Sequence, residues 1–133
     1  LRRINMSAMS DYLENEILDH VLGTGAYTAP STVYIGLSTG SFGDDNSGTE
    51  LSGSGYARQS AAFDAAAGGT TDNSAAIEFP AATGSWGTVS HFGIFDAASA
   101  GNLLIHGAFT SSKTIATGDI LRIAAGDLDV TAA

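Results

Sequence analysis

Residues 88–95, Thr-Val-Ser-His-Phe-Gly-Ile-Phe, form the most apolar of the strands that the sequence predicts. Successive side chains of a strand point to opposite faces, so Phe92 and Ile94 share one face. His91 and Phe95 share the other face. Because β-branched and aromatic residues are enriched in strands, the segment predicts a strand with large side chains on both faces.

Short segments of the same kind lie on both sides of this strand, separated by Gly, Asn, Asp and Ser. In residues 32–39 the alternation places Val33, Ile35 and Leu37 on one face. Further strands are predicted at residues 56–63, 75–79, 103–109, 114–116, 120–124 and 128–131. Since these strands follow one another without intervening helices, the pattern favours a mainly β fold, an antiparallel β-sandwich or jelly roll.

One segment, residues 11–22, predicts an amphipathic α-helix near the N-terminus. Ser10 can cap it, acidic residues occupy its first turn, and Gly23 can end it. Apolar side chains at helical spacing form one stripe: Leu13, Ile17, Leu18, Val21 and Leu22. We expect this stripe to cover the sheet or to contact a neighbouring subunit.

The length fits one domain, which we expect to span residues 10–133 and to include the helix. Residues 1–9 are expected to be an N-terminal extension outside this domain, because Met6 or Met9 is a candidate start. The first five residues lack the apolar stretch of a signal peptide. The long polar segment 40–55 is expected to be either functional or mobile.

The chain is poor in charge and acidic. Only 14% of its 133 residues are charged, against about 25% in a typical domain, and its net charge is -9. Phosphate binding needs clustered Lys and Arg, and beyond Arg2 and Arg3 the bases Arg58, Lys113 and Arg122 are isolated in the sequence. We therefore expect no nucleic-acid partner and no anionic membrane. No apolar run approaches the roughly 18 residues that a transmembrane helix needs.

The sequence shows no recognisable catalytic or metal-binding pattern. His20, His91 and His106 lack the spacing of zinc ligands, and there is no Cys. Residues 44–50 carry oxygen ligands, which keeps calcium as an alternative to a solvated acidic loop. However, Thr49 or Glu50 stands where an EF-hand loop needs Gly. We therefore expect no enzyme and no cofactor.

The aromatic residues raise a different alternative, a carbohydrate-binding module. Trp86 together with Tyr27, Tyr34 and Tyr56 supplies flat rings of the kind that stack on sugars. A single Trp near the start of a strand is more typical of a core or hairpin position.

Several stretches, taken in order, resemble a family of small virion proteins of tailed bacteriophages that are commonly labelled tail-fibre proteins. The stretches are Tyr12-Leu-Glu-Asn-Glu, Thr32-Val-Tyr-Ile-Gly-Leu, Gly55-Tyr-Ala-Arg-Gln, Phe79-Pro-Ala-Ala-Thr, Trp86-Gly-Thr-Val-Ser-His-Phe-Gly-Ile-Phe-Asp, Gly101-Asn-Leu-Leu-Ile-His-Gly and Ala125-Gly-Asp-Leu-Asp-Val-Thr. The resemblance covers residues 10–131, and residues 86–96 are its most specific part. Similar small β-sandwiches serve as capsid decoration (cement) proteins, usually as trimers.

The resemblance implies a non-enzymatic virion structural protein, assembled in the cytoplasm of the bacterial host. We expect it to form a homo-oligomer, with a trimer favoured, and to dock on a major capsid or tail protein. A capsid decoration role is slightly favoured over a tail-fibre role, and binding to host-surface glycans is the alternative. The candidate contact residues are Leu13, Ile17, Leu18, Val21, Leu22, Trp86, Phe92 and Phe95. Small side chains at Ala61, Ala62, Ala65, Ala66, Ala67, Ala75 and Ala76 would let backbones of neighbouring copies approach closely.

Overall fold

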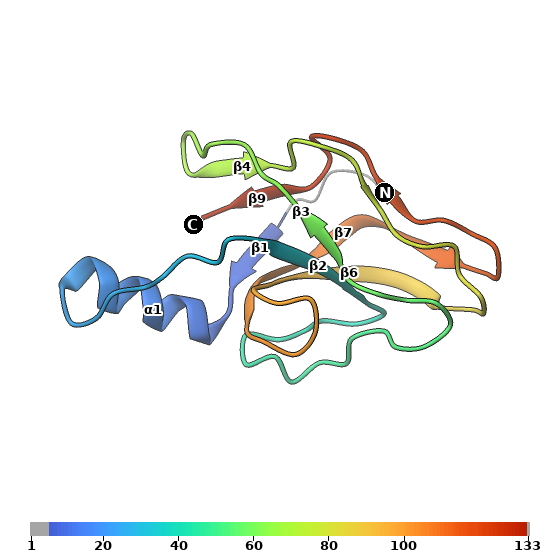
Figure 1. Cartoon of the computed structure of the whole chain (residues 1–133), viewed down its shortest axis with the longest axis horizontal. Helices are drawn as coiled ribbons and strands as arrows, with labels where there is room; N and C mark the ends of the chain where they lie inside the picture. Colours follow the sequence, from blue (N-terminus) through green and yellow to red (C-terminus); the bar gives the residue numbers. More distant parts are fainter. Residues whose placement is uncertain (1–5, 133) are drawn as a thin grey trace.

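The computed structural model describes residues 6–132 and shows a mainly β protein with one helix (Figure 1). The elements are β1 (Met6–Met9), α1 (Asp11–Leu22), β2 (Val33–Ser38), β3 (Gln59–Ala61), β4 (Thr70–Asp72), β5 (Ile77–Glu78), β6 (Gly87–Phe95), β7 (Leu103–Ile115), β8 (Arg122–Ile123) and β9 (Asp129–Thr131). An antiparallel five-stranded sheet has the order β1-β7-β6-β2-β3, and β4–β9 and β5–β8 form two-stranded pairs. These pairs cover one face of the sheet, which confirms the predicted sandwich.

The main core lies between the five-stranded sheet and the two short pairs. Ile35 of β2 and Phe92 of β6 pack there against Ile77 of β5 and Val130 of β9. Phe95 points to the opposite face, where it forms a smaller buried cluster with Phe42 and Leu103. The alternation predicted for β2 and β6 is therefore confirmed.

Two strands that the sequence predicted separately, 103–109 and 114–116, are one strand, β7. The polar residues between them are exposed and continue the pairing with β6, as in Val89↔Lys113 and Thr88↔Thr114. The prediction was wrong because it required apolar side chains, whereas strand pairing is made by backbone groups. Polar β4 went unpredicted for the same reason.

Residues 6–9, which were expected to belong to an N-terminal extension, are part of the five-stranded sheet. They form the edge strand β1, with pairs such as Ser7↔Gly107 and Met9↔Ile105. The Ser7 hydroxyl donates to the backbone oxygen of Thr131 at 3.1 Å, which ties β1 to β9 in the other layer. The remainder of the expected extension, residues 1–5, lies outside the described residues.

Helix α1 has the predicted bounds and caps. The Ser10 hydroxyl accepts a hydrogen bond from the Leu13 N–H at 3.1 Å and donates one to the Leu103 carbonyl at 2.5 Å. Gly23 ends the helix in the left-handed conformation, with φ +81°. Among the strands, α1 contacts only β1 and β7, and it projects from the β body (Figure 1).

Two facing glycines shape the outer face of the sheet, because Gly36 of β2 pairs with Gly93 of β6. A Cβ atom added to Gly93 would lie 2.9 Å from a carbon of Phe95 and 2.9 Å from a carbon of Leu103. A Cβ atom on Gly36 would lie 2.8 Å from a carboxylate oxygen of Glu50. Because the two glycines have no side chains, Glu50, Phe95 and Leu103 can pack close to the sheet backbone.

We predict that Gly93→Ala lowers the free energy of unfolding by about 1–3 kcal/mol, because the added methyl group overpacks the Phe95 cluster. Gly40→Ala is the control, since a Cβ atom at Gly40 meets nothing within 4 Å. Urea denaturation of both variants measures the difference. Equal free energies of unfolding in the two variants would contradict the prediction, because they would show that the Phe95 cluster accepts the added methyl group.

Candidate functional site

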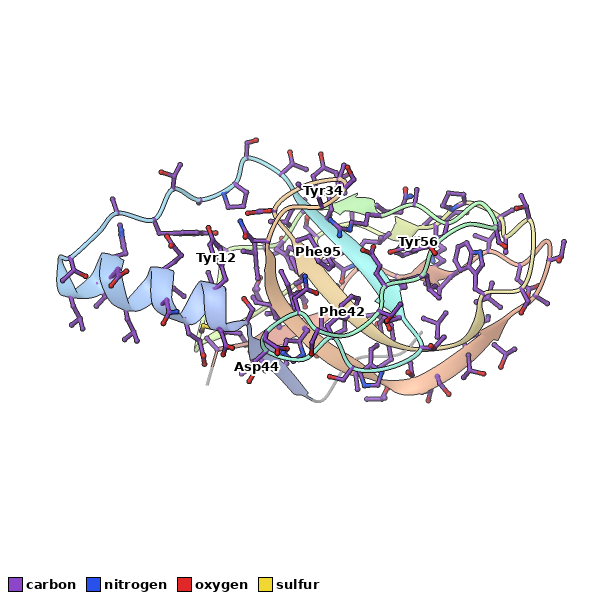
Figure 2. The ribbon with its side chains drawn as sticks, turned by 90° about the horizontal axis from the view of Figure 1, so that it is seen from below. Tyr12, Tyr34, Phe42, Asp44, Tyr56 and Phe95 are labelled. Carbon is purple, nitrogen blue, oxygen red and sulfur yellow. The ribbon has the colours of Figure 1, made fainter. Side chains whose placement is uncertain are left out.

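Residues 10–32 form an arm that leaves the β body as α1 and returns to β2 as an extended segment. The backbone N–H of Tyr27 in the returning segment donates to Nδ1 of His20 at 3.2 Å. The Thr24 hydroxyl donates to Oδ1 of Asp19 at 2.8 Å. The two limbs of the arm are therefore joined near its tip. Figures 1 and 2, viewed at right angles, both show the arm standing out from the body.

The apolar stripe of α1 becomes more exposed towards the tip. Leu13, next to the body, is 7% exposed, and Ile17 is half-buried. Leu18, Val21 and Leu22 are 56%, 71% and 72% exposed. The stripe predicted from the sequence is present, but only its first residue packs in the core. Aliphatic side chains gathered on an exposed face are typical of interaction sites.

Trp86, Phe92 and Phe95, which the sequence offered as contact residues, are buried in the monomer. The indole N–H of Trp86 donates to the Ser54 carbonyl at 2.9 Å, and its ring meets that of Tyr56 edge to face. They therefore offer little surface to a partner in the folded monomer, and the alternation of a strand does not reveal whether its second face is covered. Trp86 is also not available for stacking on a sugar ring.

Acidic residues surround the base of the arm. Asp11 and Glu14 are exposed on the first turns of α1, and Asp44 and Asp45 lie across a hollow of about 390 Å³ at its foot. Figure 2 shows Tyr12 and Asp44 at this junction. The arm, residues 10–32, contains neither Lys nor Arg. The exposed apolar tip is thus joined to an acidic foot.

Burial, with Glu16 and Asp96 nearby, raises the pKa of two tyrosines of the arm. Burial, followed by the carboxylates of Glu16 and Asp96, raises the pKa of Tyr12. Burial is also the first cause of the raised pKa of Tyr27, followed by Tyr12, Asp96 and Glu16.

Asp44 connects the arm to the sheet. Its carbonyl accepts a hydrogen bond from the Asp11 N–H at 2.8 Å, and its carboxylate lies 2.7 Å from Nε2 of His106 on β7. His91, on the adjacent strand, lies 2.7 Å from the Ser90 hydroxyl. Burial and then His106 lower the pKa of His91. Within residues 6–132 no three His, Cys, Asp or Glu side chains are placed to hold a metal ion.

The long polar segment after β2 is packed against the sheet. Phe42 is buried, and the Leu51 N–H donates to the Leu37 carbonyl at 2.9 Å. The Ser38 hydroxyl donates to the Thr49 carbonyl at 2.6 Å. Asp45, considered above as a calcium ligand, accepts from the Ser47 N–H at 3.1 Å. The segment therefore forms part of the body.

A partly buried ion pair that the sequence did not predict fixes this segment. Arg58 donates from Nε and Nη2 to the two carboxylate oxygens of Glu50, at 2.9 and 2.8 Å. Its Nη1 donates to the Ala97 and Ala100 carbonyls, both at 2.8 Å, and its Cζ lies 3.6 Å from the Phe95 ring centroid. Since Glu50 and Arg58 are not at helical spacing, no local pattern signals the pair. Its role is structural.

A second hollow, of about 590 Å³, lies where β3 faces β5. Its lining includes Val33, Ala61, Ala62, Ala75, Ala76 and Ile77, and it contains no charged residue. Four of the alanines that the sequence singled out for close approach are therefore gathered here. This hollow shares no lining residue with the hollow at the acidic foot of the arm.

Among residues 6–132 no helix has the length and apolarity that crossing a membrane requires.

Comparison with known proteins gives a family match over almost the whole chain. A family model described as "Podophage GP4 fiber I protein gp80" matches residues 8–131. The match includes α1, β2 to β9 and the second half of β1. It confirms the resemblance to phage virion proteins that are labelled tail-fibre proteins. No curated protein matches the chain.

We predict that the protein loses stability above about pH 10, and that Tyr56→Phe reduces this loss. Burial, followed by the hydrogen bond to Glu50, raises the pKa of Tyr56 above its ordinary value of 10.0. The unfolded chain therefore releases the proton first, so the stabilisation is complete below pH 10 and decreases above it. Urea unfolding at about pH 9 and pH 11 measures the effect. Tyr34→Phe is the control, and an equal pH dependence in both variants would contradict the assignment.

Proposed function

Because the chain belongs to the family of the podophage GP4 fiber I protein gp80, we propose that it is a non-enzymatic structural protein that self-associates and docks on the exterior of a phage particle. The observation that carries this proposal is the arm with its exposed Leu18, Val21 and Leu22. A monomer gains nothing from leaving three large aliphatic side chains in water, whereas burying them against a partner is favourable.

The neutral hollow between β3 and β5 supports self-association. Its walls carry Ala61, Ala62, Ala75 and Ala76, whose small side chains let another backbone approach closely. No charged group would be desolvated there, so contact between copies carries no charge-burial penalty. β3 is also an edge strand of the five-stranded sheet, and an edge offers unpaired backbone groups to another chain. We propose a trimer, in line with the resemblance to decoration proteins.

Two locations on the particle agree with this arrangement. The description of the family as a fiber protein favours a component of a fibre. The sandwich of short strands favours a decoration protein on the capsid, since it has no repeated shaft. We propose the fibre location first, with assembly in the host cytoplasm, and the capsid exterior second. Copy number separates them: a handful of copies per virion supports the fibre, and hundreds support the capsid.

We predict that Ala76→Lys converts the wild-type oligomer to monomers, because it places a charge in the neutral contact. Ala76 is exposed, so its substitution should change the free energy of unfolding by no more than about 0.5 kcal/mol. Sedimentation velocity over a range of concentrations gives the assembly state. Ala116→Lys adds the same charge at an exposed turn elsewhere and should leave the oligomer intact.

A wild-type chain that sediments as a monomer at every concentration and does not bind purified particles would contradict the proposed function. An oligomer that resists Ala76→Lys would locate self-association on a different surface.

A further inference from the structure

The exposed face of α1 has two chemically different parts in a line. Asp11, Leu18 and Leu22 follow one another along one side of the helix, at spacings of seven and four residues. Glu14 lies one turn before Leu18 on the same side. With a rise of 1.5 Å per residue, Asp11 lies about 10–16 Å along the helix from Leu18 and Leu22, and Glu14 lies about 6 Å from Leu18. A partner that covers the whole face must therefore present cationic and apolar groups at a matching separation.

The charge around this face has one sign. The helix contributes Asp11, Glu14, Glu16 and Asp19, and the packed body contributes Asp44, Asp45 and Asp96. The histidines on or facing the arm are His20, which accepts from the Tyr27 N–H, and His106, which lies against Asp44. Anionic surfaces such as nucleic acid or an acidic membrane are repelled by such a face.

A second copy of the chain is a poor match for this face. Two arms packed together would set Asp11 and Glu14 of each copy near acids of the other. Among residues 6–132 the only bases are Arg58, Lys113 and Arg122. Arg58 is held by Glu50, and Arg122 stands opposite Glu78 in the register of β5 and β8. Lys113 stands on β7 about 30 Å along the strand from Leu104, where the arm is attached.

We propose that the arm docks on a different protein, whose apolar groove is edged by Lys or Arg side chains. This inference rests on the proposed function and deepens it, since it assigns the arm to particle docking and leaves self-association to the neutral hollow. The apolar groove buries Leu18, Val21 and Leu22, and the basic edge pairs with Asp11 and Glu14. Charge complementarity of this kind accelerates association and selects among partners.

The test uses two synthetic helical peptides as probes. Both carry the same leucine stripe, and their flanks carry only Lys in one peptide and only Glu in the other. Fluorescence anisotropy with the full chain should show saturable binding of the Lys peptide, at least tenfold tighter than that of the Glu peptide. Asp11→Asn combined with Glu14→Gln should weaken binding several-fold and reduce its dependence on salt. Equal binding of the two peptides, or no binding of either, would overturn the proposal.

The apolar half of the face is tested with Leu18→Ser, Val21→Ser and Leu22→Ser combined. This variant should bind the Lys peptide at least tenfold more weakly. Ile120→Ser, at a side chain that is 48% exposed outside the arm, should bind like the wild type. Circular dichroism checks that α1 remains folded in the triple variant. If α1 unfolds, the variant with Asp11→Asn and Glu14→Gln still tests the proposal.

Sedimentation of the triple variant distinguishes this inference from the proposed function. If the arm docks on a different protein, the triple variant keeps the wild-type oligomeric state. If the variant dissociates, the arm contacts a second copy, including any contact through Arg2 and Arg3. That result would overturn the inference, while self-association itself would stand.

Discussion

Arg58 places its guanidinium between the carboxylate of Glu50 and the ring of Phe95, on the outer face of the five-stranded sheet. It thereby joins the long segment after β2, the β6–β7 turn through the Ala97 and Ala100 carbonyls, and the sheet itself. Removing one partner of this partly buried pair would leave the other charge without its counter-charge, which is destabilising. Glu50 and Phe95 can occupy these positions only because Gly36 and Gly93 have no side chains there.

The position of the arm depends on the segment that the Arg58–Glu50 pair holds against the sheet. The segment that Glu50 anchors also carries Asp44, whose carbonyl receives the N–H of Asp11 at the start of α1. Ser10 adds a second attachment through the Leu103 carbonyl at the start of β7. A rigid foot therefore supports a helix whose apolar tip is left in solvent. In the docking that we propose, the tip would not have to be ordered first, which lowers the entropic cost of binding.

Capping residues and the spacing of apolar residues correctly predicted α1 and the buried faces of β2 and β6. The cap at Ser10, the stop at Gly23 and the apolar spacing of α1 are all confirmed. The alternation that put Ile35 and Phe92 in the core is confirmed as well. β4 was missed because it is polar and is held by backbone pairing, which leaves no pattern in side-chain polarity. β1 was missed because residues 6–9 were expected to belong to an N-terminal extension. The burial of Trp86 was not predictable, because a strand pattern does not say what covers each face.

The sequence by itself determined a charge-poor, mainly β protein with one amphipathic helix and a family resemblance. The charge, the strands and the helix follow from composition, periodicity and capping, which act over a few neighbouring residues, whereas the resemblance comes from sequence stretches such as residues 86–96. Only the tertiary structure decided that Leu13 is buried while Leu18, Val21 and Leu22 stay exposed, although all four belong to one stripe. It also decided that Glu50 meets Arg58 and that four alanines line one hollow. Burial and long-range pairing depend on which distant segments the fold brings together, and no local pattern contains that information.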